Sequence, residues 1–472
     1  MNPHDPDATR KVADRGSSLR RGKQVQLDDD PNAKPGNEEV RAEPENGDTA
    51  LRGASLTVGL LALLYAISLV DRSILALLAQ PVSKALALDD RQMALLLGVG
   101  FALFYAIGGL ILGHLIDTRS RRMVVTAGIV LWSLSTVLSG FANNFWMLLI
   151  LRSGVALGEA VLTPAAISLI ADLYPRHMRG PPVAMFTSVA AFMTIGSYAV
   201  GAFAMNMAEV TSSHIGLEPW QLTFVYVGLP GLALALLFAL VARVPARSAA
   251  VKASIDEASM IVVMSYLRAR LGFFLPLLAL TGLSSLFSLA IIAWFPALLS
   301  RELGISPSRI GYLMAGVGVP AGLIGNFFWQ WVATRKLLAG PSNGIVRTFW
   351  VPALLASPIY VAGLMMDSLY LQLGFVALAM FMSTAFPVVT PMSIQLFGPP
   401  QMRARITSIY LLFIAIFGYG LAPLAAVELG ALVVGEGQGL RQGLIFLTLL
   451  VWPVILGASI LVIRKAHLAE LQ

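Results

Sequence analysis

The sequence predicts an all-α membrane protein in which twelve transmembrane helices form two bundles of six. Of its 472 residues, 57% are hydrophobic and only 12% are charged, whereas soluble domains contain about 25% charged residues. The mean hydropathy is +0.76. The apolar residues are gathered into segments long enough to cross a hydrocarbon core about 30 Å thick.

The twelve apolar segments divide into two groups of six. They cover about 55–79, 92–114, 123–141, 146–170, 181–205, 222–242, 272–299, 309–331, 345–366, 371–396, 406–432 and 441–463. The longest interior polar stretch separates the sixth segment from the seventh. The expected domains are a disordered polar N-terminal tail (1–53), an N-terminal bundle (54–243), a cytoplasmic linker (244–271), a C-terminal bundle (272–464) and a C-terminal tail (465–472).

The basic residues between the segments predict the orientation. Seventeen lie in the even-numbered connections and after the last segment, and five lie on the opposite side. Cytoplasmic loops are enriched in lysine and arginine, so both termini are expected in the cytoplasm. The sequence therefore predicts a multi-pass protein of the plasma membrane, which is the inner membrane in a bacterium.

The composition excludes several classes of function. There is no cysteine, and the five histidines are scattered without a metal-binding motif. No nucleotide-binding loop or nucleophile elbow occurs. We expect no cofactor, no metal, no catalytic residue and no nucleic-acid partner. The net charge of +7 is explained by the basic loops.

A weak internal repeat supports two related halves. The fourth segment contains Thr163-Pro164 and is followed by Met178-Arg179, and the tenth contains Thr390-Pro391 and is followed by Met402-Arg403. This spacing indicates parallel halves related by an axis along the membrane normal, with kinks at the Thr-Pro pairs.

Charged residues inside the first and fourth segments form the candidate site. Each costs about 2.5–3.5 kcal/mol at the centre of a membrane helix, so such residues face the bundle interior and need partners. At a rise of about 1.5 Å per residue, Asp71 and Arg72 lie about 6–8 Å outside the midplane, Arg152 about 9 Å outside, and Glu159 within about 2 Å of it. We therefore expect Asp71 to meet Arg152, and Arg72 to reach inward to Glu159.

The connection between the second and third segments reads Gly113-His-Leu-Ile-Asp117-Thr-Arg119-Ser-Arg121-Arg122. It resembles the cytoplasmic loop signature of the major facilitator superfamily, although Thr118 and Ser120 depart from it. The resemblance implies the fold of that superfamily and a cytoplasmic gate. The expected gate residues are Gly113, Asp117, Arg121, Arg122, Arg179 and Arg403.

Within that superfamily, the N-terminal half resembles the Spinster family. The resemblance rests on the loop just quoted and on three further stretches: Asp71-Arg72, Leu151-Arg152-Ser-Gly-Val-Ala-Leu-Gly158-Glu159-Ala160, and Leu169-Ile-Ala-Asp172-Leu with Arg179 following. It implies alternating-access transport of lysophospholipids or sphingosine-phosphate-like lipids, coupled to protons in some members. Here Ser68-Leu69-Val70 replaces the residues usual before the Asp-Arg pair.

The four charged residues suggest a coupling mechanism. Burial favours the neutral form of a carboxyl group, and a nearby arginine favours the charged form. We hypothesise that Glu159 or Asp71 takes up a proton and frees an arginine for an anionic head group. The alternative is a permanent ion pair that only fixes helix packing.

The charges of the second half lie at or beyond the ends of its segments, except for Glu428, which lies inside a segment near its outer end. Its aromatic residues predict an apolar pocket wall that would bind a hydrocarbon chain. The alternative is that these side chains are bundle core or face lipid. The residues expected in this wall are Phe287, Trp294, Phe381, Phe386, Tyr410 and Phe413.

These observations favour a secondary transporter, a monomer, that moves an anionic amphiphile through the bilayer with protons as the coupling ion. Small organic anions such as sugar acids, or hydrophobic drugs, are the alternative substrates. A lipid receptor or sensor without transport is the alternative outside this class. No motif supports an intramembrane lipid enzyme.

Overall fold

The computed structural model describes residues 50–245, 260–338, 344–435 and 439–470, and all regular elements within these ranges are helices. The N-terminal half contains α1 (Ala54–Leu77), α2 (Ala79–Leu86), α3 (Asp90–Leu97), α4 (Val99–Thr118), α5 (Arg121–Ser139), α6 (Phe145–Glu159), α7 (Leu162–Leu173), a 3₁₀ turn (Arg176–Met178), α8 (Gly180–Ile215) and α9 (Pro219–Val241).

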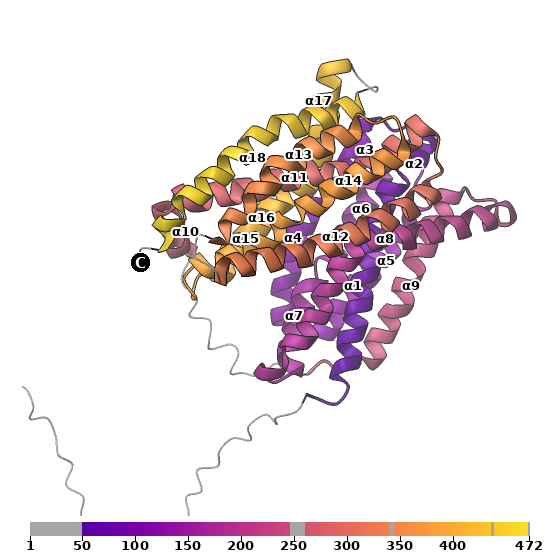
Figure 1. Cartoon of the computed structure of the whole chain (residues 1–472). Coiled ribbons are helices and arrows are strands. Elements are labelled where there is room, and N and C mark those ends of the chain that lie inside the picture. The colour runs from indigo at the N-terminus through magenta and orange to yellow at the C-terminus, as the bar shows by residue number, and fades with distance from the viewer. Residues whose placement is uncertain (1–49, 246–259, 339–343, 436–438, 471–472) are drawn as a thin grey trace, which may run out of the picture. The chain divides into compact units, whose positions relative to one another are not determined.

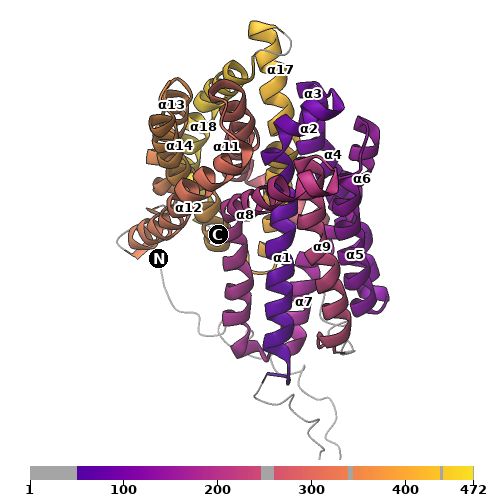
Figure 2. The ribbon, with the colours of Figure 1, turned by 90° about the vertical axis from the view of Figure 1, so that its right-hand side faces the viewer.

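The C-terminal half contains α10 (Met260–Ala269), α11 (Leu271–Leu303), α12 (Pro307–Leu338), a 3₁₀ turn (Val346–Phe349), α13 (Trp350–Leu364), α14 (Leu369–Ser383), α15 (Ala385–Phe397), α16 (Arg403–Phe413), a π-helical segment (Ile414–Leu421), α17 (Ala422–Val434) and α18 (Leu440–Glu470). In both views of the ribbon, the indigo-to-magenta helices of the first half group together, and the orange-to-yellow helices of the second half group beside them (Figures 1 and 2).

Within the described residues, ten helices, some of them in two pieces, are long and apolar enough to span a membrane, or eleven if the bent pair within α8 is counted as one span. The sequence predicts twelve. The ninth predicted segment explains one difference, because it folds as a 3₁₀ turn followed by a 15-residue α-helix, too short to be counted. The all-helical architecture is confirmed, whereas the count of twelve and the cytoplasmic termini stay predictions.

Two predicted boundaries differ from those of the helices. Within the predicted linker, Met260–Ala269 form α10, while residues 246–259 lie outside the described part of the chain. At the other end, α18 continues to Glu470, into the predicted C-terminal tail. Residues 1–49 of the predicted N-terminal tail also lie outside the described ranges.

The fourth and tenth predicted segments are both divided into two helices, because proline cannot donate to the carbonyl four residues earlier and clashes with it. Pro164 faces the carbonyl of Ala160, where α6 ends. In the tenth segment the break at Thr384 is explained by Pro387, whereas Pro391 lies inside α15 without interrupting it. The expected kink at Thr390-Pro391 is therefore displaced by one turn.

The buried side chains form two hydrophobic cores. One consists only of N-terminal residues, from the beginning of α1, from α4 to α8 and from the end of α9. The other joins the C-terminal half to the C-terminal end of α1, to α2, α3 and α8, and to parts of α6 and α9. The two halves thus share a core at the end of the molecule where α2 and α3 lie.

Candidate functional site

A buried ion pair joins α1 to the last residue of α6. Arg72 Nη2 donates to Glu159 Oε2 at 2.8 Å. The side chain of Glu159 is 1% exposed, whereas that of Arg72 is 21% exposed. The arginine is therefore reachable from outside the bundle core and its partner is not.

Asp71 and Arg152 are in contact, but not through the carboxylate–guanidinium pair that the sequence suggests. Arg152 Nη1 donates to the backbone oxygen of Asp71 at 3.1 Å, and not to its carboxylate. The Asp71 side chain is fully buried beside Thr136 of α5. Neither of its carboxylate oxygens has a hydrogen-bond partner in the described part of the chain. Asp71 and Arg72 are adjacent on one helix, so they point about 100° apart, and only Arg72 is directed at Glu159.

Aromatic rings surround the Arg72 guanidinium. Its central carbon lies 4.9 Å from the ring centre of Phe101 and 5.1 Å from that of Tyr105, both on α4. It also lies 5.7 Å from the ring centre of Tyr419, on the π-helical segment of the other half. Cation–π contacts of this kind strengthen when they are removed from water. Arg72 therefore lies at the boundary between the two halves.

Arg72 lines a hollow of about 100 Å³ that adjoins a larger cavity of about 570 Å³. The two share Thr194, Leu289, Ile292 and Tyr419. The larger cavity is formed mainly by helices of the C-terminal half, with one wall from α8. Its volume falls in the usual range for small-molecule sites, about 300–1,000 Å³.

The aromatic wall expected from the sequence is not the lining of this cavity in the described part of the chain. None of the six aromatic residues lies among the described residues that line it. They pack elsewhere: the ring of Phe287 against Tyr360, that of Phe386 against Phe349, and Trp294 Nε1 donates to the backbone oxygen of Pro423 at 2.9 Å. Phe381 contacts the rings of Phe328 and Trp329, Tyr410 is 4% exposed, and Phe413 contacts Phe417.

The cavity is instead lined by hydroxyl and amide side chains among apolar ones. These are Thr194, Ser284, Ser285, Ser288, Asn326, Gln330, Tyr360, Ser383, Thr384 and Tyr419. The sequence contains a signal for part of this set, because Ser284, Ser285 and Ser288 follow one another on a face of the seventh segment.

The expected gate residues make contacts within their own halves. Arg121 pairs with Asp172, and Arg122 donates to the backbone oxygen of Ala242 at 2.7 Å. Two others close the ends of helices: Arg179 donates to the backbone oxygens of Ala171 and Tyr174, and Arg403 to that of Gly398. Gly113 and Asp117 lie in α4, but their side chains are outside the described part of the structure.

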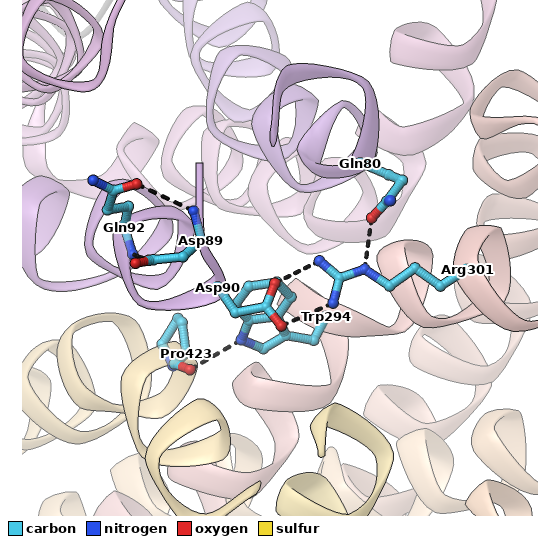
Figure 3. Close-up of polar contacts among 7 residues, drawn as sticks. All are labelled: Gln80, Asp89, Asp90, Gln92, Trp294, Arg301 and Pro423. Carbon is cyan, nitrogen blue, oxygen red and sulfur yellow. Dashed lines mark hydrogen bonds and ion pairs between the residues drawn. The ribbon is translucent and has the colours of Figure 1, made fainter. Parts of the chain in front are cut away.

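At the other end of the molecule, ion pairs connect the two halves. Arg301 of α11 donates to both carboxylate oxygens of Asp90 at 2.5 and 2.9 Å, and to Gln80 at 2.6 Å (Figure 3). Arg91 donates to Glu428 of α17 at 2.8 and 3.2 Å. We call these five residues the latch. Sequence reasoning did not find it.

Local structure positions the latch. Asp89 caps α3, because its side chain accepts from the backbone N–H of Gln92 at 2.7 Å while the Gln92 side chain accepts from the backbone N–H of Asp89 at 3.1 Å (Figure 3). Such a reciprocal cap satisfies two otherwise unpaired donors and fixes where the helix begins. Asp90 and Arg91 are therefore held in the first turn of α3, facing α11 and α17.

The sequence matches the Major Facilitator Superfamily over residues 61–423. The chain belongs to this superfamily. An MFS-type efflux pump from Mycolicibacterium smegmatis is 27% identical over 367 residues, which are 78% of this chain and 82% of that protein. A probable galactarate/D-glucarate transporter from Escherichia coli is 25% identical over 345 residues, 66% of this chain and 73% of that one.

The resemblance to the Spinster family is confirmed. Protein spinster homolog 1 of Xenopus laevis is 32% identical over 229 residues, which are 47% of this chain and 42% of that protein. The crystal structure of a bacterial homologue of the human lysosomal transporter Spinster, inward-facing and unoccupied, matches the fold with a TM-score of 0.76. That match has 23% identity and covers 88% of this chain and 99% of the other.

In this superfamily member, the Gly-Glu-Ala motif has a packing role as well as a charge. A Cβ atom on Gly158 would lie 2.5 Å from the backbone oxygen of Gly128 and 2.7 Å from the backbone nitrogen of Trp132, both on α5. The glycine therefore lets α6 approach α5 closely. Glu159 follows directly, so this contact also positions the carboxylate.

Proposed function

We propose that this transporter moves an anionic amphiphile, of the lysophospholipid or sphingosine-phosphate type, by alternating access coupled to protons. The observation that carries the proposal is Arg72. It is a partly exposed cation held by a buried carboxylate, and it lines a hollow that adjoins a cavity of about 570 Å³. A cation in this position attracts an anionic group, and the mixed lining of the cavity suits an amphipathic remainder.

Proton coupling would follow from competition for Arg72. An anionic head group that binds the guanidinium displaces Glu159, whose other oxygen already has no partner within the described residues. An uncompensated buried charge is costly, so protonation of the displaced carboxyl group stabilises the loaded state. Asp71 is the second candidate proton carrier, because its buried carboxyl oxygens have no hydrogen-bond partner in the part of the chain that is described.

The first test is the pH dependence of uptake. In proteoliposomes, Glu159→Gln and Asp71→Asn are expected to flatten the dependence of uptake on a pH gradient, while counterflow of labelled substrate continues without ATP. Glu209→Gln is the control, because Glu209 is exposed near the end of α8. Unchanged pH dependence in both variants would leave only a structural ion pair. Binding without exchange would favour a receptor or sensor.

A second candidate substrate is a sugar acid or another hydroxylated organic anion. The hydroxyl and amide side chains of the cavity favour it, because such groups recognise substrate hydroxyls. The galactarate/D-glucarate transporter among the relatives supports the same class. Uptake measured with a lysophospholipid and with a hexonic acid distinguishes the two candidates.

A further inference from the structure

Three residues that line the large cavity carry hydroxyl groups without a hydrogen-bond partner in the described part of the chain. The three are Ser288 on α11, Tyr360 on α13 and Ser383 at the end of α14. All three residues line the cavity, and Tyr360 is fully buried. The Tyr360 hydroxyl lies close to both serine side chains, but within the described chain none of the three oxygens forms a hydrogen bond.

Neighbouring hydroxyl groups of the same cavity do form hydrogen bonds. Ser284 and Ser285 donate to the backbone oxygen of Thr281 at 2.9 and 2.8 Å, and Thr384 donates to that of Phe381 at 2.7 Å. Such local bonds are the usual way in which a serine or threonine within a helix is satisfied. Ser288 and Ser383 are also on helices, but their hydroxyls make no such bond within the described chain.

A buried hydroxyl without a partner costs about 1–3 kcal/mol. Three of them on adjoining helices therefore indicate a group that binds there. No charged side chain lines this cavity among the residues that the structure describes, so a group that binds there without a charged partner is expected to be uncharged. It must also offer several hydrogen-bonding atoms.

We propose that Ser288, Tyr360 and Ser383 form a subsite for a hydroxyl-bearing, uncharged part of the transported anion. This rests on the function proposed above, in which Arg72 holds the charged end. The hollow beside Arg72 and the cavity share Leu289 of α11, which is adjacent to Ser288 in the sequence. An anion held at Arg72 therefore extends toward these hydroxyls.

The test compares hydroxylated anions with hydroxyl-free ones on the purified full chain. The first probe pair is D-gluconate and hexanoate, and the second is lysophosphatidylglycerol and dodecyl phosphate. The wild type is expected to prefer the hydroxylated member of at least one pair, and the pair identifies whether a sugar acid or a lipid head group is the source. Tyr360→Phe and Ser383→Ala are each expected to weaken binding of that member about tenfold and to change binding of its partner less than about twofold.

Matched controls separate this role from packing. Tyr226→Phe removes a tyrosine hydroxyl that contacts Thr211. Ser393→Ala removes a serine hydroxyl that donates to the backbone oxygen of Val389. Neither lines the cavity among the described residues. Both controls should leave the ratio of the two affinities unchanged.

The outcomes distinguish the two proposals. Equal losses for both members of each pair, or no loss for either, would overturn the subsite. If both members bind equally to the wild type and Arg72→Gln abolishes both, the transporter proposal stands and the subsite fails. If the wild type binds no anion of either pair, both proposals fail.

Discussion

At the scale of single residues, the pair of Arg72 and Glu159 is asymmetric. Glu159 is almost completely buried, while Arg72 is partly exposed and is surrounded by three aromatic rings. Removal of one member of a buried pair is costly because it leaves the other charge uncompensated. A single substitution in this pair is therefore expected to cost more stability than substitution of both residues.

We expect Arg72→Gln to destabilise the protein by about 3–5 kcal/mol, because Glu159 is left as a buried charge without its partner. The double variant Arg72→Gln/Glu159→Gln should recover most of that loss, because the buried carboxylate that had lost its partner is also removed. Thermal unfolding of the wild type, the two single variants Arg72→Gln and Glu159→Gln, and the double variant in the same detergent measures the difference. If the losses of the two single variants simply add in the double variant, the pair does not stabilise the fold.

The double variant also separates stability from function. It restores the neutral balance but has no cation for the substrate, so transport should remain absent although the melting temperature recovers. Recovery of transport together with stability would show that Arg72 does not bind the anion.

At the scale of helices, the close contact of α5 with α6 depends on Gly158 and Gly128. A Cβ atom on Gly158 would lie 2.5 Å from the backbone oxygen of Gly128, and one on Gly128 would lie 3.0 Å from that of Gly158. Small residues at such crossings allow the dispersion contacts that hold membrane helices together. The crossing lies next to Glu159, so the geometry of the ion pair depends on it.

Gly158→Ala is expected to lower stability by about 1–3 kcal/mol, because a methyl group does not fit against the backbone of α5. It should also reduce transport, since Glu159 moves with α6. The control is Gly109→Ala, because a Cβ on Gly109 in α4 meets no atom within 4 Å. The melting temperatures and counterflow rates of both variants test this. Equal behaviour of the two would contradict the packing role.

The sequence predicted some of these features and not others, for physical reasons. The pairing of Arg72 with Glu159 could be predicted for two reasons. A charge inside a membrane span is costly without a partner, and few charges lie inside the spans. The rise per residue of a helix also sets the depth of each charge in the membrane. The lining of the cavity did not follow, because an aromatic residue on an apolar helix has the same pattern whether it faces core, lipid or substrate. Phe287 and Phe386 proved to be core.

The latch shows a different limit of sequence reasoning. Asp90 and Arg301 are 211 positions apart, and each lies at a helix end where charges are common. Nothing local indicates that they meet. Their pairing depends on how the two halves pack, which the hydropathy pattern does not contain.

At the scale of the whole transporter, the latch and the shared hydrophobic core lie at the same end of the described chain. The basic-residue count predicts that this end faces away from the cytoplasm. The proposed alternating access requires this end to open, so the latch is expected to bias the equilibrium toward the state in which this end is closed. A bidentate, charge-assisted pair contributes about 1.5–3 kcal/mol to such a bias.

Weakening the latch should therefore open this end of the transporter. The chain has no cysteine, so Ser73→Cys provides a single label beside Arg72 in the hollow. Adding Asp90→Asn is expected to increase its labelling by a membrane-impermeant maleimide, applied from the latch side, about tenfold. The exchange of charges in Asp90→Arg with Arg301→Asp should restore slow labelling, because it restores an ion pair between the halves.

The matched control for this experiment is an ion pair at the same end within one half. Arg441 pairs with Glu302, and both belong to the C-terminal half. Glu302→Gln removes the charge on one partner but no contact between the halves, so it should not change the labelling of Ser73→Cys. If Glu302→Gln and Asp90→Asn accelerate labelling equally, loss of surface charge and not release of the latch is the cause. The resting state would then depend on the shared hydrophobic core alone, and variants in that core, not in the latch, would control access.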